Sequence, residues 1–192
     1  MGIRRRVFTL LFSFAVLAVS CKTVRFGPNA VDINGMIYDF SNRPVAYCEI
    51  LLGGRYRASS DINGRFSLPN VRVGDYTLEG HKDGFEKYAD EVSVRERGQI
   101  IYIRLPSQNQ LLALIDAALV ANNIPLALEM AERAYQIDAN NVETLFYFAT
   151  VKFKQGEYAA AAEFLEAARA LGSRDIYIDK FLSQLKEMQY GK

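Results

Sequence analysis

The spacing of the apolar residues changes once along this chain, at Pro106-Ser107. Before this point apolar and polar residues alternate, which is the two-residue period of a β-strand. After it, apolar residues recur every three or four positions, which is the period of an α-helix. Runs of strands followed by runs of helices are typical of two separately packed parts. We therefore predict a multidomain protein, β then α, with a β domain over 32–106 and a helical domain over 108–190.

The β half consists of short alternating segments separated by turn residues. Its alternations include Ile33, Gly35 and Ile37, then Cys48, Ile50 and Leu52, then Phe66 and Leu68, and finally Ile101, Ile103 and Leu105. Several short strands at such spacing predict an antiparallel β-sandwich. Asn63-Gly64 stands between two of these segments, and this dipeptide is a strong signal for a β-hairpin.

An ordered set of motifs in this half resembles the carboxypeptidase regulatory-like, transthyretin-like β-sandwich family. The matching positions are Gly35, Asp39, Pro44-Val45, Asp61-x-Asn63-Gly64-x-Phe66-x-Leu68, Val71, Gly74-x-Tyr76-x-Leu78 and Gly84-Phe85. The resemblance covers nearly all of 33–105. It implies about seven strands, no catalysis, and a role as a spacer or docking element beside other modules.

The helical half contains an internal repeat. Leu111 and Leu145 are 34 positions apart, as are Ala127 and Ala161. A helix–turn–helix unit of this length is the signature of a tetratricopeptide repeat. The resemblance gives two units, 108–141 and 142–175, followed by a capping helix over 176–188. Two units are fewer than usually stand alone, so the cap, the sandwich or a second copy is expected to cover the remaining apolar face.

The resemblance to tetratricopeptide repeats also implies a concave groove that binds a protein partner. The groove positions correspond here to Leu112, Asp116, Leu119, Phe146, Thr150 and Phe153. An alternative is equally open, because apolar stripes on helices are core by default. In that case the two phenylalanines contact the cap or neighbouring helices.

The N-terminal segment 1–20 has the pattern of a secretory signal peptide. Met1–Arg6 is basic, Val7–Val19 is an apolar run too short to cross a bilayer, and Ala18-Val19-Ser20 precedes Cys21. This arrangement is similar to a bacterial lipobox, which implies lipidation of Cys21 and a tether over 21–31. Ordinary cleavage after Ser20 and a retained anchor are the alternatives. Two or more acyl chains would hold the protein stably on a membrane.

The residues that usually carry chemistry are scarce. The chain has one histidine, His81, and two cysteines, Cys21 and Cys48, which disfavours a metal site, a cofactor site or a disulfide framework. We expect Cys48 to be a buried, inert thiol and His81 to be solvated. Asp61 and Asn63 form only part of a calcium loop. Without Arg4, Arg5 and Arg6 the 23 basic residues fall to 20, against 22 acidic ones. The sequence shows no basic patch of the kind that would indicate nucleic-acid binding.

These features favour a non-catalytic envelope lipoprotein that presents its helical repeats to a protein partner. The expected location is extracytoplasmic, anchored by lipid to a bacterial membrane, at the outer membrane or the cell surface. The alternative is a surface adhesin or carbohydrate-binding module that uses the sandwich loops, including Arg55-Tyr56-Arg57. The absence of tryptophan weakens this alternative, because sugar-binding platforms favour large flat rings.

Overall fold

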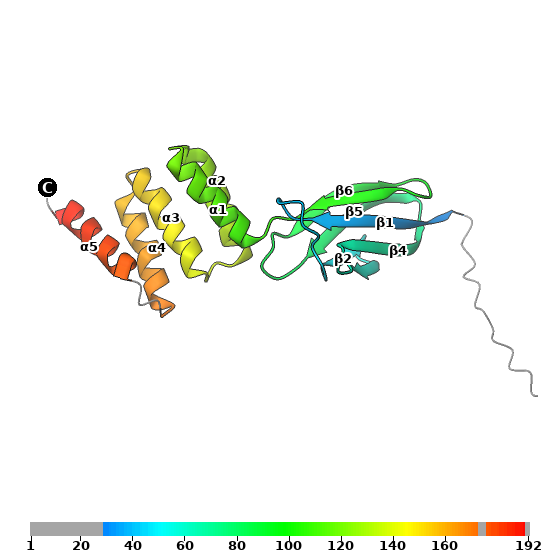
Figure 1. Ribbon diagram of the computed structural model, residues 1–192, viewed down its shortest axis with the longest axis horizontal. Helices are drawn as coiled ribbons and strands as arrows, with labels where there is room; N and C mark the ends of the chain where they lie inside the picture. The colour runs from blue at the N-terminus through cyan, green and yellow to red at the C-terminus, as the bar shows by residue number, and fades with distance from the viewer. Residues whose placement is uncertain (1–28, 173–175, 191–192) are drawn as a thin grey trace, which may run out of the picture.

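The computed structural model describes residues 29–172 and 176–190, which form a β domain followed by a helical domain (Figure 1). The strands of this part of the chain are β1 (Ala30–Tyr38), β2 (Glu49–Leu52), β3 (Tyr56–Ser59), β4 (Arg65–Arg72), β5 (Gly74–His81), β6 (Tyr88–Val94) and β7 (Ile100–Arg104). Its helices are α1 (Gln108–Val120), α2 (Ile124–Ile137), α3 (Val142–Lys154), α4 (Tyr158–Ala170) and α5 (Ile176–Tyr190). The predicted signal peptide and Cys21 lie outside the described residues. None of the described helices is both long and apolar enough to cross a membrane.

The β domain is a sandwich of two sheets, as predicted. One sheet has the order β4-β1-β7 and the other the order β3-β2-β5-β6. The inward residues of the alternating segments are buried together between the sheets, and they include Ile33, Ile37, Ile50, Leu52, Leu68, Leu78 and Ile103. The alternation of apolar and polar residues therefore predicts correctly which side chains of these strands point into the core.

One strand pairing differs from the antiparallel expectation. β7 runs parallel to β1, with Gly35 opposite Ile101 and Ile37 opposite Ile103, whereas the other pairings are antiparallel. The alternation of apolar residues gives the face of a strand but not its direction. A parallel pair requires a long connection, which β2 to β6 supply here. Between β1 and β7 the chain crosses to the other sheet and returns twice, first through β2 and β3 to β4 and then through β5 and β6 to β7.

The prediction of a hairpin at Asn63-Gly64 is wrong. The turn joins β3 in one sheet to β4 in the other, and β4 pairs with β1. The Asp61 carboxylate accepts hydrogen bonds from the backbone N–H groups of Asn63 and Arg65, at 2.8 and 2.9 Å. Gly64 has φ +74°, and a Cβ atom there would lie 2.4 Å from the carbonyl oxygen of Ile37. The absence of a side chain at Gly64 thus allows this turn to approach β1 closely.

Helices α1, α2 and α3 begin at side chains that cap their free N–H groups, whereas α4 has no side-chain cap. Ser107 caps α1 in a capping box with Gln110. The side-chain oxygens of Asn123 and Asn141 accept hydrogen bonds from the third residue of α2 and α3, respectively. Pro125 lies in the first turn of α2, where a missing N–H costs nothing. These signals set the helix starts at the spacing of the repeat.

The helical domain has two adjoining cores that share α3. Residues of α1, α2 and α3 form the first, and residues of α3, α4 and α5 form the second. Ala127, Ala134, Ala161 and Ala168 are fully buried where paired helices approach each other. α5 covers the open side of the second pair through Ile178, Leu182 and Leu185. The predicted tetratricopeptide-like array with a capping helix is therefore observed.

The two domains are joined by backbone and side-chain contacts as well as by the chain itself. The backbones of Phe85 and Ser107 pair, flanked by hydrogen bonds from Glu86 N to Pro106 O and from Gln108 N to Gly84 O. Arg133 of α2 donates two hydrogen bonds of 2.8 Å to the Glu86 carboxylate. Figure 1 shows the domains end to end, with the start of β1 at the opposite end of the molecule from α5.

Candidate protein-binding surface

The six residues predicted to line a groove lie on α1 and α3, two neighbouring helices of the first core. On α1, Leu112 is buried, Leu119 is half-buried and Asp116 is exposed. On α3, Phe146, Thr150 and Phe153 are all half-buried. The Thr150 hydroxyl donates a 2.9 Å hydrogen bond to the carbonyl of Phe146 within the same helix, so it is already satisfied locally.

The two phenylalanines of this set pack against the capping helix. The rings of Phe146 and Phe153 lie 6.2 and 5.3 Å from the ring of Phe181 on α5, both edge to face. Phe153 also contacts Tyr158 of α4 at 5.5 Å. Such pairs stabilise packing beyond the area they bury. Both side chains therefore help to hold α5 in place, and each keeps an accessible part.

A hollow of about 770 Å³ opens beside Phe146. It lies between the turn that precedes α3, the first turn of α3 and the first turn of α5. Its apolar side is formed by Val142, Phe146, Tyr177 and Ile178, and its polar side by Asp138, Asn140, Asn141 and Glu143. Of the six predicted residues only Phe146 lines it.

Sequence reasoning missed most of the lining of this hollow. A capping helix needs one apolar stripe, which Ile178, Leu182 and Leu185 provide. Ile176 and Tyr177 are additional apolar residues at its start, and both are at least 70% exposed. These additional apolar side chains are the sequence feature that could have indicated the hollow. A helix that only covers a core needs a single apolar face.

The charged side chains that line the hollow are both acidic. Asp138 and Glu143 line the hollow, and Asp116 is exposed on the neighbouring helix. Burial raises the pKa of the Tyr147 hydroxyl, and the carboxylates of Asp116 and Glu143 raise it further. A mixed apolar and acidic surface fits a segment that carries both apolar and basic side chains.

The reactive side chains of the sandwich do not assemble into a second site. Cys48 is free and fully buried, as predicted, and burial raises its pKa to about 11. His81 ends β5 and is exposed beside Asp83. Asp61 is occupied by the turn before β4. Within the described ranges, no group of three or more His, Cys, Asp or Glu side chains could hold a metal ion.

Two family models match separate parts of the chain. Residues 34–101 match polysaccharide lyase family 4, domain II, and residues 121–190 match anaphase-promoting complex, cyclosome, subunit 3. Neither match reaches half of the 192 residues. Together they support a transthyretin-like β domain followed by tetratricopeptide-like repeats. No curated protein matches the chain.

Solved structures resemble less than half of the chain and only distantly. A type II cohesin–X-dockerin complex from Acetivibrio cellulolyticus has 19% identity and a TM-score of 0.37, covering 42% of this chain and 60% of that one. The major pilin subunit BcpA of Bacillus cereus has 19% identity and a TM-score of 0.34, covering 42% and 30%. A DUF3823 family protein from Parabacteroides merdae has 16% identity and a TM-score of 0.28, covering 41% and 46%. The chain thus spans less than two thirds of the length of each of these structures, and likenesses at this level do not bear on function.

Proposed function

We propose that this protein is a non-catalytic scaffold of a bacterial envelope, anchored by a lipid on Cys21. In this proposal the sandwich separates the helical array from the membrane, and the array binds a protein partner. The observation that carries it is the tetratricopeptide-like array, because repeats of this kind expose extended concave surfaces for protein segments. The end-to-end arrangement puts α3 and α5, whose first turns line the hollow, far from the start of β1 (Figure 1).

The chemistry of the hollow specifies the partner segment further. Phe146, Tyr177 and Ile178 would receive apolar side chains, and Asp138 and Glu143 would receive a lysine or arginine. Buried aromatic anchors with a charged rim are the common arrangement of protein interfaces. The expected partner is therefore an envelope protein with an accessible basic and apolar segment.

Removal of the two carboxylates tests the partner site. Asp138→Asn with Glu143→Gln keeps side-chain shape and removes the charge, and we expect at least about a tenfold loss in capture of the cross-linked partner from cells. The matched control is Glu163→Gln with Glu166→Gln, two exposed carboxylates on α4. Equal capture by both double variants would exclude the hollow as the binding surface.

Lipidation is tested separately at Cys21. Cys21→Ala should abolish labelling with a fatty-acid analogue and release the protein from membranes, because the acyl chains would be the anchor. Full membrane retention of the Cys21→Ala protein would show that a different segment anchors it.

The sandwich supports a second candidate, contact with carbohydrate. The match of 34–101 to a polysaccharide lyase domain favours it. Tyr102 of β7, 64% exposed on the outer sheet face, would be the stacking ring. Binding to a glycan array that is lost in Tyr102→Ala would favour this role over the scaffold.

A further inference from the structure

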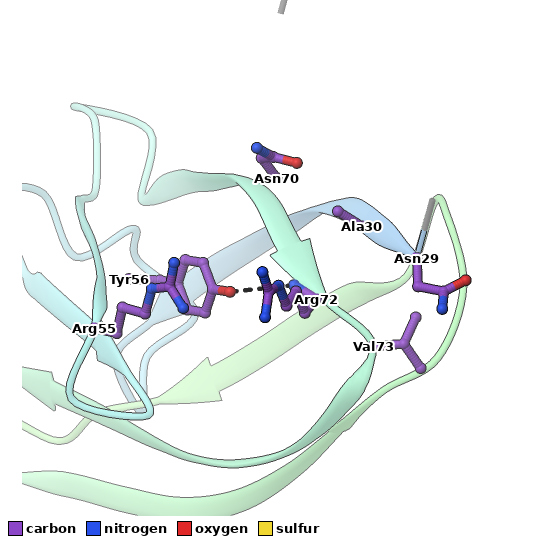
Figure 2. A pocket seen from close by; sticks show the side chains of 7 residues that line it. All are labelled: Asn29, Ala30, Arg55, Tyr56, Asn70, Arg72 and Val73. Atoms are coloured by element: carbon purple, nitrogen blue, oxygen red, sulfur yellow. Dashed lines mark hydrogen bonds between the residues drawn. The ribbon is translucent and has the colours of Figure 1, made fainter. Parts of the chain in front are cut away.

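The end of the sandwich at which β1 begins carries a second hollow, of about 450 Å³. Side chains from three places line it (Figure 2): Arg55 and Tyr56 from the start of β3, Asn70 and Arg72 from the end of β4, and Asn29 from just before β1. Ala30, the first residue of β1, lines this hollow, and the start of β1 lies at the far end of the molecule from the helical array (Figure 1). This hollow shares no residue with the proposed partner site.

Tyr56 contacts the side chain of one arginine of this hollow and the backbone of the other. The Arg55 guanidinium lies 5.2 Å from the centre of the Tyr56 ring, in a cation–π contact. The Tyr56 hydroxyl accepts a 3.3 Å hydrogen bond from the backbone N–H of Arg72, drawn dashed in Figure 2. Tyr76 supports this arrangement, because its ring packs edge-on against Tyr56 and its hydroxyl donates to the Arg72 carbonyl. An aromatic contact therefore positions the Arg55 guanidinium, and the two tyrosine hydroxyls hold the backbone of Arg72.

The positive charge of the two arginines is not neutralised within the described residues. No carboxylate of that part of the chain forms an ion pair with Arg55 or Arg72. Two acidic side chains of the same end are engaged by other groups. Asp75 pairs with Arg95 at 2.7 Å, and Asp32 accepts a hydrogen bond from the backbone N–H of Asn70. The hollow thus offers two guanidinium groups and the exposed side chains of Asn29 and Asn70 to an anion.

We propose that this hollow binds the phosphate of an anionic phospholipid headgroup. Guanidinium groups present paired N–H donors that match phosphate oxygens, and an asparagine amide adds a further donor. The lipid source rests on the proposed anchor. Eight residue steps separate Cys21 from Asn29, and so few residues span at most about 28 Å even when fully extended. An acylated Cys21 would therefore keep this end of the sandwich close to the headgroups.

A unique fluorophore makes this site measurable. The chain contains no tryptophan, so Val73→Trp, on the rim of the hollow, supplies the only tryptophan emission. The full chain in neutral detergent micelles is titrated with phosphatidylglycerol or phosphatidylcholine. We expect a saturable change in emission with phosphatidylglycerol only, and weaker binding at higher salt.

Charge removal then assigns the response to the two arginines. Arg55→Gln with Arg72→Gln should lower the apparent affinity for phosphatidylglycerol about 25-fold, the product of about fivefold for each basic residue at an anionic surface. Arg57→Gln with Arg65→Gln removes the same charge from other exposed positions of β3 and β4 and should leave the affinity within about twofold. All four are surface residues, so circular dichroism should show an unchanged melting temperature.

Three results would overturn the proposal. Equal responses to both lipids would remove the anion preference, and equal losses in the two double variants would remove the specific site. A response to inorganic phosphate alone that matches the lipid response would identify a site for free phosphate instead. The titration is repeated with Cys21→Ala, in which we expect the same binding. Failure of lipidation would then refute the anchor and leave the headgroup site intact.

Discussion

Cys48 shows how burial decides the chemistry of one side chain. Its thiol lies in the sandwich core, and loss of solvation raises its pKa to about 11, against smaller opposing effects of His81 and Lys82. The thiolate is the reactive form of cysteine. The native protein therefore keeps this group protonated and unreactive at neutral pH. The inward position of Cys48 could be predicted from the alternation with Ile50 and Leu52.

This burial predicts slow thiol labelling. In a Cys21→Ala chain Cys48 is the one remaining cysteine, and at pH 8 its reaction with a disulfide reagent should be at least about 100-fold slower in the native than in the unfolded protein. Because the pKa is raised on folding, the folded state holds the proton more tightly between about pH 9 and pH 11, and stability falls as pH rises through this window. Rapid stoichiometric labelling of the native protein at pH 8 would contradict a buried thiol.

At the scale of elements, the sequence predicts which side of a strand is buried and where a helix begins. It predicts less well which strands pair with each other. The inward residues of β1 and the starts of α1 and α3 follow from local patterns, because periodicity and caps act within a few residues. The strand that pairs with β4 does not follow from a local pattern. The Asp61–Gly64 turn reverses the chain but does not determine which sheet the next strand enters. For the same reason the parallel pairing of β7 with β1 was not predicted. Strand pairing depends on contacts between distant residues, which a single sequence does not display.

The capping helix α5 depends on a small aromatic cluster. Phe181 contacts both Phe146 and Phe153, and it is half-buried at the second core. Phe181→Ala should lower the free energy of unfolding of the helical domain by about 2–3 kcal/mol, somewhat less than for a fully buried phenylalanine. Thermal unfolding followed by circular dichroism measures this loss. Met188→Ala, a change at a 48% exposed position of the same helix, is the control and should cost under about 1 kcal/mol.

The predicted groove residues can be tested in the same series. A double-mutant cycle between Phe153 and Phe181 should give a coupling of about 0.5–1.5 kcal/mol if their rings stabilise each other. A coupling near zero, with partner capture lost in Phe153→Ala alone, would instead assign Phe153 to partner binding. The tetratricopeptide resemblance could locate this row of side chains. It could not show how much of the row α5 covers, because that depends on how α5 packs on α3.

At the scale of the whole molecule, the joint between the domains decides whether the chain is a rigid rod or two tethered parts. Arg133 and Glu86 are 47 positions apart in the chain, and no local pattern links them. In the structure their side chains are only 30% and 27% exposed, and the hydrogen bonds with Glu86 raise the pKa of Arg133. The Arg133 guanidinium also lies 5.8 Å from the Phe40 ring centre. A bidentate pair of this kind fixes orientation as well as distance.

Loss of this pair should therefore loosen the molecule without unfolding either domain. Spin labels at Ile62→Cys and Val120→Cys, two highly exposed positions in different domains, report the distance between them, and the buried Cys48 does not label. In the Cys21→Ala background we expect a narrow distance distribution, which Glu86→Gln with Arg133→Met should broaden while both domains keep their circular dichroism. Glu157→Gln, which weakens the Lys152–Glu157 ion pair within the helical array, should leave the distance distribution narrow.

An unchanged width of the distribution in the Glu86→Gln, Arg133→Met variant would mean that the backbone pairing of Phe85 with Ser107 suffices to hold the domains. A broadened width would show that the Arg133–Glu86 pair keeps the two domains at a fixed separation.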